Sequence, residues 1–218
     1  MNPRRPTLRR PGLLFMDMDS TLIQCECIDE IADFLGIKPQ VAAITERAMR
    51  GELDFAASLT ERVQLLAGLE ESVLDRVYAE RIRLTPGAEE LIATLKAHGW
   101  KVGVVSGGFT WFTRRLQARL GLDYALANEL EIHDGRLTGG IKGAIVDAQA
   151  KKQALLSQAA AWSIPLEQTV AVGDGANDLP MILAAGLGIA FHAKPAVVER
   201  APAAITNGGL DKVLEFLV

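Results

Sequence analysis

Apolar residues along this chain follow two patterns. Short runs, bounded by glycine, proline or polar residues, occur at 13–16, 101–105, 169–174 and 187–191, with a weaker run at 203–205. Runs of this length with such boundaries are typical of buried strands. Because they do not alternate with polar residues, they favour a parallel sheet that is covered on both faces.

The second pattern occupies residues 22–84, where apolar residues recur at helical spacings and no strand pattern intrudes. One stripe consists of Phe55, Leu59, Val63 and Leu66, and glycines separate successive stripes. A connection between parallel strands needs only about a dozen residues. This block is therefore too long for an ordinary crossover, and we predict a separate helical lobe.

From residue 85 onward, predicted helices alternate with strands, and a last helix is expected at 210–217. Asp134-Gly135 between the extended segments 128–132 and 136–141 predicts a β-hairpin. This alternation predicts a doubly wound, Rossmann-like α/β core with a mainly parallel sheet. We expect a core formed by 12–22 and 85–218, a helical lobe at 23–84, and a flexible basic arm at 1–11.

Composition is that of an ordinary folded domain. The chain has 218 residues, 49% of them hydrophobic, which is enough for a full core. Its net charge of −4 gives no electrostatic reason to expect a nucleic-acid partner. No apolar stretch approaches the length needed to span a membrane, so no membrane partner is expected either. The oligomeric state is left open.

Cysteine usage indicates a reducing compartment. Cys25 and Cys27 lie two residues apart, and no second pair completes a zinc site. We interpret them as two reduced thiols, which suits a cytoplasmic protein.

Two carboxylates follow the first predicted strand. Asp17 and Asp19 lie at its carboxyl end, where ligands bind in parallel sheets. If the chain stays extended there, both side chains point the same way and repel each other, so the site needs a cation. For this pair alone, a solvated acidic turn is an equally good interpretation.

The longer string that begins at Asp17, DMDSTLIQCECIDEIA, resembles the first motif of the haloacid dehalogenase-like phosphatases. It is most similar to the branch of that family that hydrolyses O-phosphoserine. The resemblance implies a helical cap over the active site and hydrolysis through an aspartyl-phosphate. It also implies O-phosphoserine as the small-molecule substrate, converted to serine and phosphate in the last step of serine biosynthesis. Asp17 would be the nucleophile and Asp19 the general acid and base.

Two further segments match the family in order. A strand that runs into Ser106-Gly107-Gly108 and then a helix can present N–H groups to an anion, although it can also be a plain turn. The resemblance implies that Ser106 and Gly107 hold phosphoryl oxygens. The family's third motif is a lysine, and spacing to the next leucine favours Lys151 over Lys152 without excluding the latter.

The segment GDGAND at 173–178 resembles the fourth motif of the family. The resemblance implies that Asp174 is a metal ligand, that Asn177 contacts the substrate and that Asp178 orients the site from behind. Several acidic groups at strand ends repel one another unless a hard cation lies between them, and Mg²⁺ is the usual choice beside phosphate. Its ligands would be Asp17, Asp174 and the carbonyl of Asp19.

Three residues of the predicted lobe match those that recognise O-phosphoserine in the resembled branch. Glu26 would bind the ammonium group, Arg62 the carboxylate, and Phe55 would close over the substrate. Taken singly, Arg62 can also be an exposed helix residue and Phe55 part of the core of the lobe.

Two other functions remain open. The first is a related phosphatase or phosphotransferase that acts on another small phosphorylated metabolite. The second is a phospho-acceptor signalling domain, which is also doubly wound and carries an acidic cluster and a lysine. The helical lobe and an acid/base at Asp19 argue against the second. Release of many phosphates per chain would indicate an enzyme, whereas one phosphate retained per chain would indicate a signalling domain.

Overall fold

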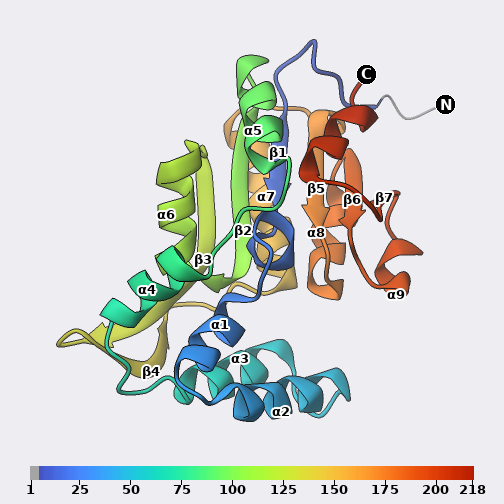
Figure 1. The fold of residues 1–218 in the computed structure, drawn as a ribbon. Coiled ribbons are helices and arrows are strands. Elements are labelled where there is room, and N and C mark those ends of the chain that lie inside the picture. The colour runs from blue at the N-terminus through green and yellow to red at the C-terminus, as the bar shows by residue number, and fades with distance from the viewer. Residues whose placement is uncertain (1–4) are drawn as a thin grey trace.

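A seven-stranded sheet runs through the centre of the molecule (Figure 1). The structure is a computed structural model and describes residues 5–218. Within that range the strands are β1 (Leu13–Met16), β2 (Lys101–Phe109), β3 (Tyr124–His133), β4 (Arg136–Lys142), β5 (Thr169–Gly173), β6 (Leu187–Phe191) and β7 (Ala203–Ile205). Their spatial order is β4-β3-β2-β1-β5-β6-β7, and the pairs are parallel apart from β3 with β4. The predicted mainly parallel α/β fold is confirmed.

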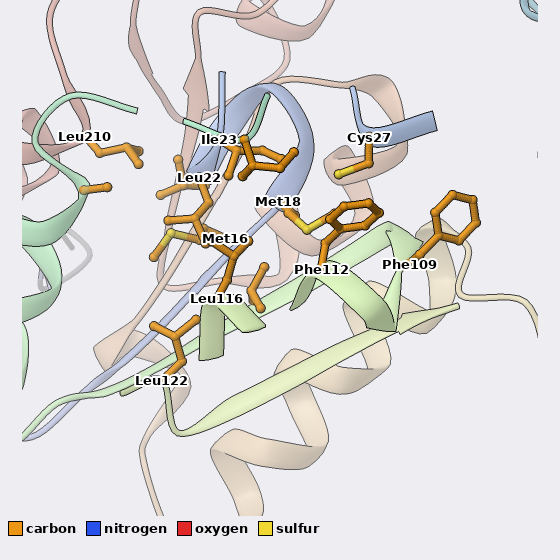
Figure 2. Packing of buried hydrophobic residues seen from close by; sticks show 14 of the residues in the cluster. Met16, Met18, Leu22, Ile23, Cys27, Phe109, Phe112, Leu116, Leu122 and Leu210 are labelled. Atoms are coloured by element: carbon orange, nitrogen blue, oxygen red, sulfur yellow. The ribbon is translucent and has the colours of Figure 1, made fainter. Parts of the chain in front are cut away.

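Helices cover both faces of this sheet, as the apolar strands require. The helices of the core are α5 (Ala88–Ala97), α6 (Thr110–Leu120), α7 (Ala148–Ala161), α8 (Leu179–Ala184) and α9 (Pro195–Val198), with shorter turns η2 (Leu166–Gln168), η3 (Ala176–Asp178) and η4 (Leu210–Phe216). Leu14 and Met16 of β1 pack with α5, α6 and η4, whereas Leu13 and Phe15 pack with α7 and α8. Figure 2 shows part of the first cluster, including Met16.

Strand β1 is the topological centre of the core. All four of its side chains are completely buried, and each such apolar side chain contributes about 1.5–3 kcal/mol to folding. The chain continues from β1 to β2 and β3 on one side, and then returns to β5, β6 and β7 on the other. The carboxyl ends of β1, β2 and β5 therefore meet at the point where the strand order reverses, which is where open α/β sheets bind ligands.

Four helices lie between β1 and β2 in sequence: α1 (Cys27–Phe34), α2 (Lys38–Met49), α3 (Phe55–Gln64) and α4 (Ser72–Glu80). Figure 1 shows α1, α2 and α3 gathered beyond one end of the sheet. The two chain segments that enter and leave this lobe pair with each other through an antiparallel bridge between Ile23 and Leu84. The predicted inserted helical lobe is therefore present.

The lobe has a second attachment to the core, at the β3–β4 hairpin. Residues 68–71 run along the edge of β4: Gly68 N–H donates to Leu137 O (2.8 Å), Leu137 N–H to Leu69 O (2.9 Å), and Glu71 N–H to Gly135 O (2.9 Å). The segment that precedes α4 thus extends the core sheet, so a hinge at 23 and 84 is not the only connection between lobe and core.

Two predicted elements differ from the structure near their ends. The hairpin itself is confirmed, and Asp134 and Gly135 both have positive φ angles (49° and 72°). Strand β2, however, continues to Phe109 instead of ending in a turn at Ser106, because β3 runs beside it. The last helix is a 3₁₀ segment.

The amino-terminal segment is held in place over most of the range predicted to be a flexible arm. Thr7 N–H donates to Gln168 Oε1 (3.1 Å), Gln168 Nε2 donates to Arg10 O (3.0 Å), and Val218 N–H donates to Pro6 O (3.1 Å). Residues 6–10 of the predicted arm therefore form hydrogen bonds with the core, and residues 1–4 lie outside the described range. The buried side chain of Gln168 fixes this segment, and the local sequence of the arm does not reveal such a partner.

Candidate active site

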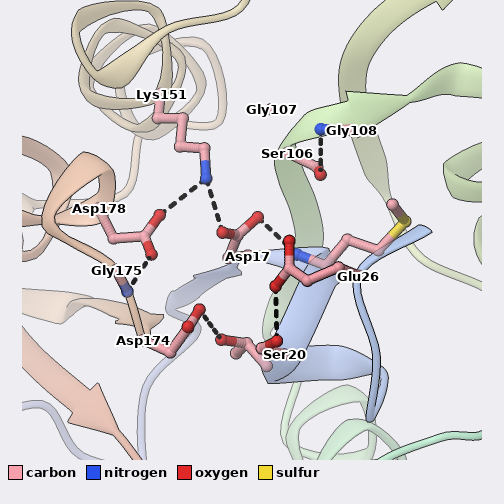
Figure 3. A network of polar contacts seen from close by, with 12 residues as sticks. Asp17, Ser20, Glu26, Ser106, Gly107, Gly108, Lys151, Asp174, Gly175 and Asp178 are labelled. Atoms are coloured by element: carbon pink, nitrogen blue, oxygen red, sulfur yellow. Dashed lines mark hydrogen bonds and ion pairs between the residues drawn. The ribbon is translucent and has the colours of Figure 1, made fainter. Parts of the chain in front are cut away.

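Three carboxylates meet where the strand order of the sheet reverses (Figure 3). Two lie at strand ends and the third in the turn that follows β5. Asp17 follows β1, Asp174 follows β5, and Asp178 ends η3. One oxygen of each lies within 4.8 Å of the others. This convergence is the one expected from parallel strands that carry acidic residues at their carboxyl ends.

A single wide turn, η1 (Met18–Leu22), places Asp19 beside Asp17. Its hydrogen bonds span five residues: Leu22 N–H donates to Asp17 O (3.3 Å) and Ile23 N–H to Met18 O (3.0 Å). Ser20 has a positive φ of 54°, which turns the chain back on itself. Asp19 then accepts a hydrogen bond from Cys27 N–H at 3.0 Å, which ties it to the start of α1.

Lys151 lies behind the nucleophile candidate and is only 1% exposed. Its Nζ is 2.8 Å from Asp17 Oδ2 and 2.7 Å from Asp178 Oδ1. Figure 3 marks both contacts with dashed lines. Asp178 Oδ2 in turn accepts from Gly175 N–H at 3.0 Å. Helix α7 begins at Ala148, so Lys151 lies near its start. The structure thus places Lys151, rather than Lys152, in the acidic site.

The pKa values of two carboxyl groups in this site, Asp17 and Asp174, are raised. Burial, followed by the proximity of Asp178, raises the pKa of Asp17 well above its ordinary value, although Lys151 opposes the shift. Burial and the neighbouring acids also raise the pKa of Asp174 to about 6. Burial alone would lower the pKa of Lys151. Asp17 and Asp178 outweigh this effect and raise the pKa above its ordinary value, so Lys151 is protonated at neutral pH.

Asp19 is suited to proton transfer. Burial, together with the charge of Glu26, raises the pKa of Asp19 to about 7. A general acid or base works best when its pKa lies near the pH of the reaction, so this carboxyl can both donate and accept a proton at neutral pH.

A cavity of about 110 Å³ lies between the core and the lobe. Eight of the residues singled out from the sequence line it: Asp17, Asp19, Glu26, Phe55, Arg62, Gly107, Asp174 and Asn177. Three others lie behind the wall: Ser106 contacts Gly108, Lys151 contacts Asp17, and Asp178 is held behind Lys151. The structure therefore brings together all the residues that the sequence singled out.

The lobe contributes one acidic and one basic side chain, Glu26 and Arg62, to this cavity. Glu26 Oε1 accepts a hydrogen bond from Ser20 Oγ at 2.6 Å. Arg62 is half-buried, and burial lowers the pKa of its guanidinium. Its Nε donates to Ser58 O at 3.2 Å, and no carboxylate within residues 5–218 forms an ion pair with it. The guanidinium is therefore able to bind an anionic group in the cavity.

Two glycines of β2 are required by their neighbours across the cavity. A Cβ at Gly107 would lie 2.8 Å from Cζ of Phe55, and a Cβ at Gly108 would lie 2.6 Å from Oδ2 of Asp19. Gly107 thus permits the contact between lobe and core, and Gly108 leaves room for Asp19.

The sequence did not single out several residues that complete the site. Gly108 could have been found from its place in the Ser-Gly-Gly segment, and so could Thr21, which follows the acidic motif and donates from Oγ1 to Asp174 Oδ1 at 3.2 Å. Ile28, Leu59 and Phe109 add apolar walls. No local signal distinguishes these three from ordinary core residues.

The side chains present fit a hard metal ion. Asp17, Asp174 and Asp178 offer only oxygen atoms, and Mg²⁺ and Ca²⁺ prefer such ligands. Both oxygens of Asp178 already accept hydrogen bonds from Lys151 and Gly175, so Asp17 and Asp174 are the better ligands. The raised carboxyl pKa values have the same implication, because Lys151 alone does not balance the negative charge.

The two thiols near this site are protonated. Burial, reinforced by Asp19, raises the pKa of Cys25 to about 12 and raises that of Cys27 as well. They take no part in the acidic cluster. Among the described helices, none is both long enough and apolar enough to cross a membrane.

Known proteins are similar in sequence to this chain over most of its length. Residues 14–183 match the haloacid dehalogenase-like hydrolase family. A phosphoserine phosphatase from Streptomyces coelicolor is 58% identical over 209 residues, a match that covers 96% of this chain and 51% of that protein. One from Idiomarina loihiensis is 54% identical, covering 94% of this chain and 93% of the relative. The chain thus spans about half the length of the first relative and nearly all of the second.

A solved structure has the same fold. A phosphoserine phosphatase determined as a phospho-aspartyl intermediate analogue superimposes with a TM-score of 0.89 at 44% identity, covering 96% of this chain and 100% of that one. The family match covers most of the chain, and the structure places the motif carboxylates and Lys151 in one site. The expected family is therefore confirmed: this chain belongs to the haloacid dehalogenase-like hydrolases.

Proposed function

We propose that this chain hydrolyses O-phosphoserine to serine and phosphate. The observation that carries the proposal is the composition of the cavity, in which Asp17 and Asp19 lie at the core side while Glu26 and Arg62 line the lobe side. A phosphate at the carboxylates would leave the ammonium and carboxylate of the same molecule near an acid and a guanidinium. The relatives named phosphoserine phosphatase support this substrate. A role in serine biosynthesis and a cytoplasmic location stay predictions.

In the first half of the proposed reaction, Asp17 attacks phosphorus. A bond forms between one carboxylate oxygen of Asp17 and phosphorus, while the bond from phosphorus to the serine oxygen breaks. Asp19 gives its proton to that leaving oxygen, so serine departs as the neutral alcohol. Lys151, at 2.8 Å from Asp17, favours the ionised form that the attack requires.

In the second half, water attacks phosphorus of the aspartyl-phosphate. Asp19, now ionised, takes a proton from that water, and the bond between phosphorus and the Asp17 oxygen breaks. Phosphate leaves and both carboxyl groups return to their starting states. We assign Ser106, Gly107 and Asn177 to the phosphoryl oxygens, and Asp178 to the positioning of Lys151.

We further propose that Asp17, Asp174 and the backbone carbonyl of Asp19 hold Mg²⁺. When bound, the ion offsets negative charge on the phosphoryl oxygens. The oxygen-only donor set and the shortage of positive charge near Asp17 support this assignment.

Replacing Asp174 with Asn should weaken Mg²⁺ binding by at least roughly tenfold, since an amide is a poorer ligand and a charge is lost. Isothermal titration of the chain with Mg²⁺, without substrate, measures this directly. Asp123→Asn is a matched control, because Asp123 pairs with Lys101 away from the cavity. Equal Mg²⁺ affinity in the wild type and Asp174→Asn would exclude Asp174 as a ligand.

We propose that residues 23–84 act as a cap that selects the substrate. Phe55 rests against Gly107, so the cap touches the proposed phosphate site. The attachment of residues 68–71 to the hairpin holds the α4 end of the cap on the core. Opening and closing are therefore expected to involve α1, α2 and the start of α3 more than α4.

Arg62→Ala should reduce kcat/KM for O-phosphoserine by about ten- to a hundredfold, because a charge-assisted contact with the carboxylate is worth about 1.5–3 kcal/mol. Phosphoethanolamine keeps the ammonium group and lacks the carboxylate, so its hydrolysis should barely change. Arg50→Ala, in the same lobe but paired with Glu52 at its surface, is the control. Equal losses on both esters would mean that Arg62 supports the lobe and does not recognise the substrate.

A panel of phosphate monoesters tests the proposed function. O-phosphoserine should be hydrolysed with a higher kcat/KM than phosphoethanolamine or phosphoglycerate, each of which lacks one of the two recognised groups. Faster hydrolysis of another small ester would favour a different phosphatase. Transfer of phosphate to an added alcohol would favour a phosphotransferase, and one phosphate retained per chain would favour a signalling domain.

A further inference from the structure

Strand β2 bulges where it passes the site. The register with β3 moves from Val105 opposite Leu126 to Phe109 opposite Asn128, so residues 106–108 of β2 have fewer partners than a regular strand offers. A bulge of this kind removes carbonyl and N–H groups from the ladder, and buried groups of this type need other partners.

Asn128 provides such a partner. Its side chain is 1% exposed, and its Nδ2 donates to the carbonyl oxygen of Gly107 at 2.8 Å. Its Oδ1 accepts from Val146 N–H, also at 2.8 Å. The opposite amide orientation would place oxygen against oxygen and nitrogen against nitrogen, so the two contacts fix the orientation of the amide.

This contact also sets the direction of a neighbouring N–H group. The carbonyl of Gly107 and the N–H of Gly108 belong to one planar trans peptide, and they point in opposite directions. With the carbonyl held by Asn128, the N–H of Gly108 donates to Ser106 Oγ at 2.9 Å. Both flanking residues are glycines, which oppose rotation of this peptide less than other residues do.

The three contacts form a chain in which every donor points the same way. It runs from Val146 N–H to the amide of Asn128, then through the 107–108 peptide to Ser106 Oγ. A hydroxyl has one proton to donate, and Gly108 occupies one of its acceptor positions. The Ser106 proton is thereby left for an acceptor other than Gly108, and aligned hydrogen bonds strengthen one another.

We propose that Asn128 is a positioning residue that orients the hydroxyl of Ser106 as a donor to a phosphoryl oxygen. The proposal rests on the role given to Ser106 in the proposed function. Asn128 touches neither the cavity nor the carboxylates, and it acts through the 107–108 peptide. Without it, this peptide can rotate and carry the Gly108 N–H away from Ser106 Oγ.

The Asn128→Asp variant separates the two contacts of this amide. The carboxylate keeps an acceptor for Val146 N–H but presents an oxygen to the Gly107 carbonyl. We expect the inhibition constant of inorganic phosphate to rise at least roughly tenfold, and kcat/KM for O-phosphoserine to fall about ten- to a hundredfold, which is less than for outright loss of a donor because Ser106 itself remains. Mg²⁺ affinity should not change.

Thr169→Val is the matched control for a loss of stability alone. Thr169 is completely buried, and it likewise bridges two segments, donating to Leu166 O at 2.7 Å and accepting from Gly186 N–H at 3.0 Å. It lies at the start of β5, away from the site. This variant should lower the melting temperature without raising the phosphate inhibition constant. A similar rise in both variants would overturn the proposal.

A double-mutant cycle with Ser106→Ala tests whether Asn128 acts through Ser106. In the Ser106→Ala background, Asn128→Asp should change the phosphate inhibition constant less than about twofold, since the shared contact is already gone. Independent, multiplicative losses would overturn the positioning role. No effect of Ser106→Ala alone would remove Ser106 from the site and overturn the proposal too, whereas turnover of O-phosphoserine by the wild type tests the proposed function separately.

One measurement does not depend on whether an Asn128 variant folds. In the wild type labelled with ¹⁵N-glycine, the Gly108 amide should be protected from hydrogen exchange, and Ser106→Ala should remove this protection. An unprotected Gly108 amide in the wild type would contradict the orientation on which the proposal depends.

Discussion

The Asp17→Asn variant is expected to fold normally and to lose turnover by at least roughly a thousandfold. An amide oxygen is a poor nucleophile for phosphorus, so no covalent intermediate can form. Folding should be retained because Asn has the same shape, and its carbonyl oxygen can still accept from Met18 N–H. Phosphate release from O-phosphoserine measures the first effect, and thermal unfolding measures the second.

Asp19→Asn provides the comparison that isolates the nucleophile. It should also lose turnover of O-phosphoserine, because no acid protonates the leaving serine oxygen. Acetyl phosphate has a leaving group that needs no proton, so the Asp19→Asn chain should still take up its phosphoryl group, whereas the Asp17→Asn chain should not. Steady phosphatase activity of Asp17→Asn would show that the covalent mechanism is wrong.

The Lys151→Met variant should have the second largest effect. Methionine has a similar length but no charge, so Asp17 and Asp178 would face each other without a counter-ion. We expect turnover to fall by about 10²–10³-fold, in the range for loss of a group that stabilises a developing charge. Removing one partner of a buried ion pair costs about 3–5 kcal/mol of unfolding free energy, and less where a carboxyl takes up a proton.

The pH dependence of this loss has a definite sign. In Lys151→Met, Asp17 lacks the cation that favours its ionised form, so ionising it in the folded state becomes costlier. The difference in unfolding free energy from the wild type should therefore grow as the pH rises and shrink as Asp17 becomes protonated. Denaturant unfolding at several pH values measures it.

Lys152→Met is the control for this variant, because Lys152 is the neighbouring residue and makes no ion pair within residues 5–218. It should change turnover and stability little. Equal effects of both substitutions would contradict the assignment of Lys151 to the site.

Features with a local cause could be predicted from the sequence. The strands at 13–16, 187–191 and 203–205 have the expected bounds, because uninterrupted apolar runs between turn residues leave few alternatives. The hairpin followed from Asp134-Gly135 in the same way. The choice between Lys151 and Lys152 required the structure, because only the rotation of α7 shows which ammonium group points at Asp17.

Features that depend on distant partners could not be predicted. Residues 6–10 contain no pattern that indicates order, and Gln168 holds them from across the sequence. The continuation of β2 through Ser106 depends on β3 running beside it. Asn128 looked like an ordinary strand residue, and its contacts with Gly107 and Val146 exist only once three separate segments meet.

The most direct test of the central claim is the mass of the chain, quenched in acid during steady turnover of O-phosphoserine with Mg²⁺ and then mapped by proteolysis. We predict that a fraction of the chains carries one phosphoryl group on the peptide that contains Asp17, while phosphate accumulates to many equivalents per chain. Phosphate release without this adduct, an adduct on another residue, or an adduct on Asp17 that never turns over would contradict hydrolysis through an aspartyl-phosphate at Asp17.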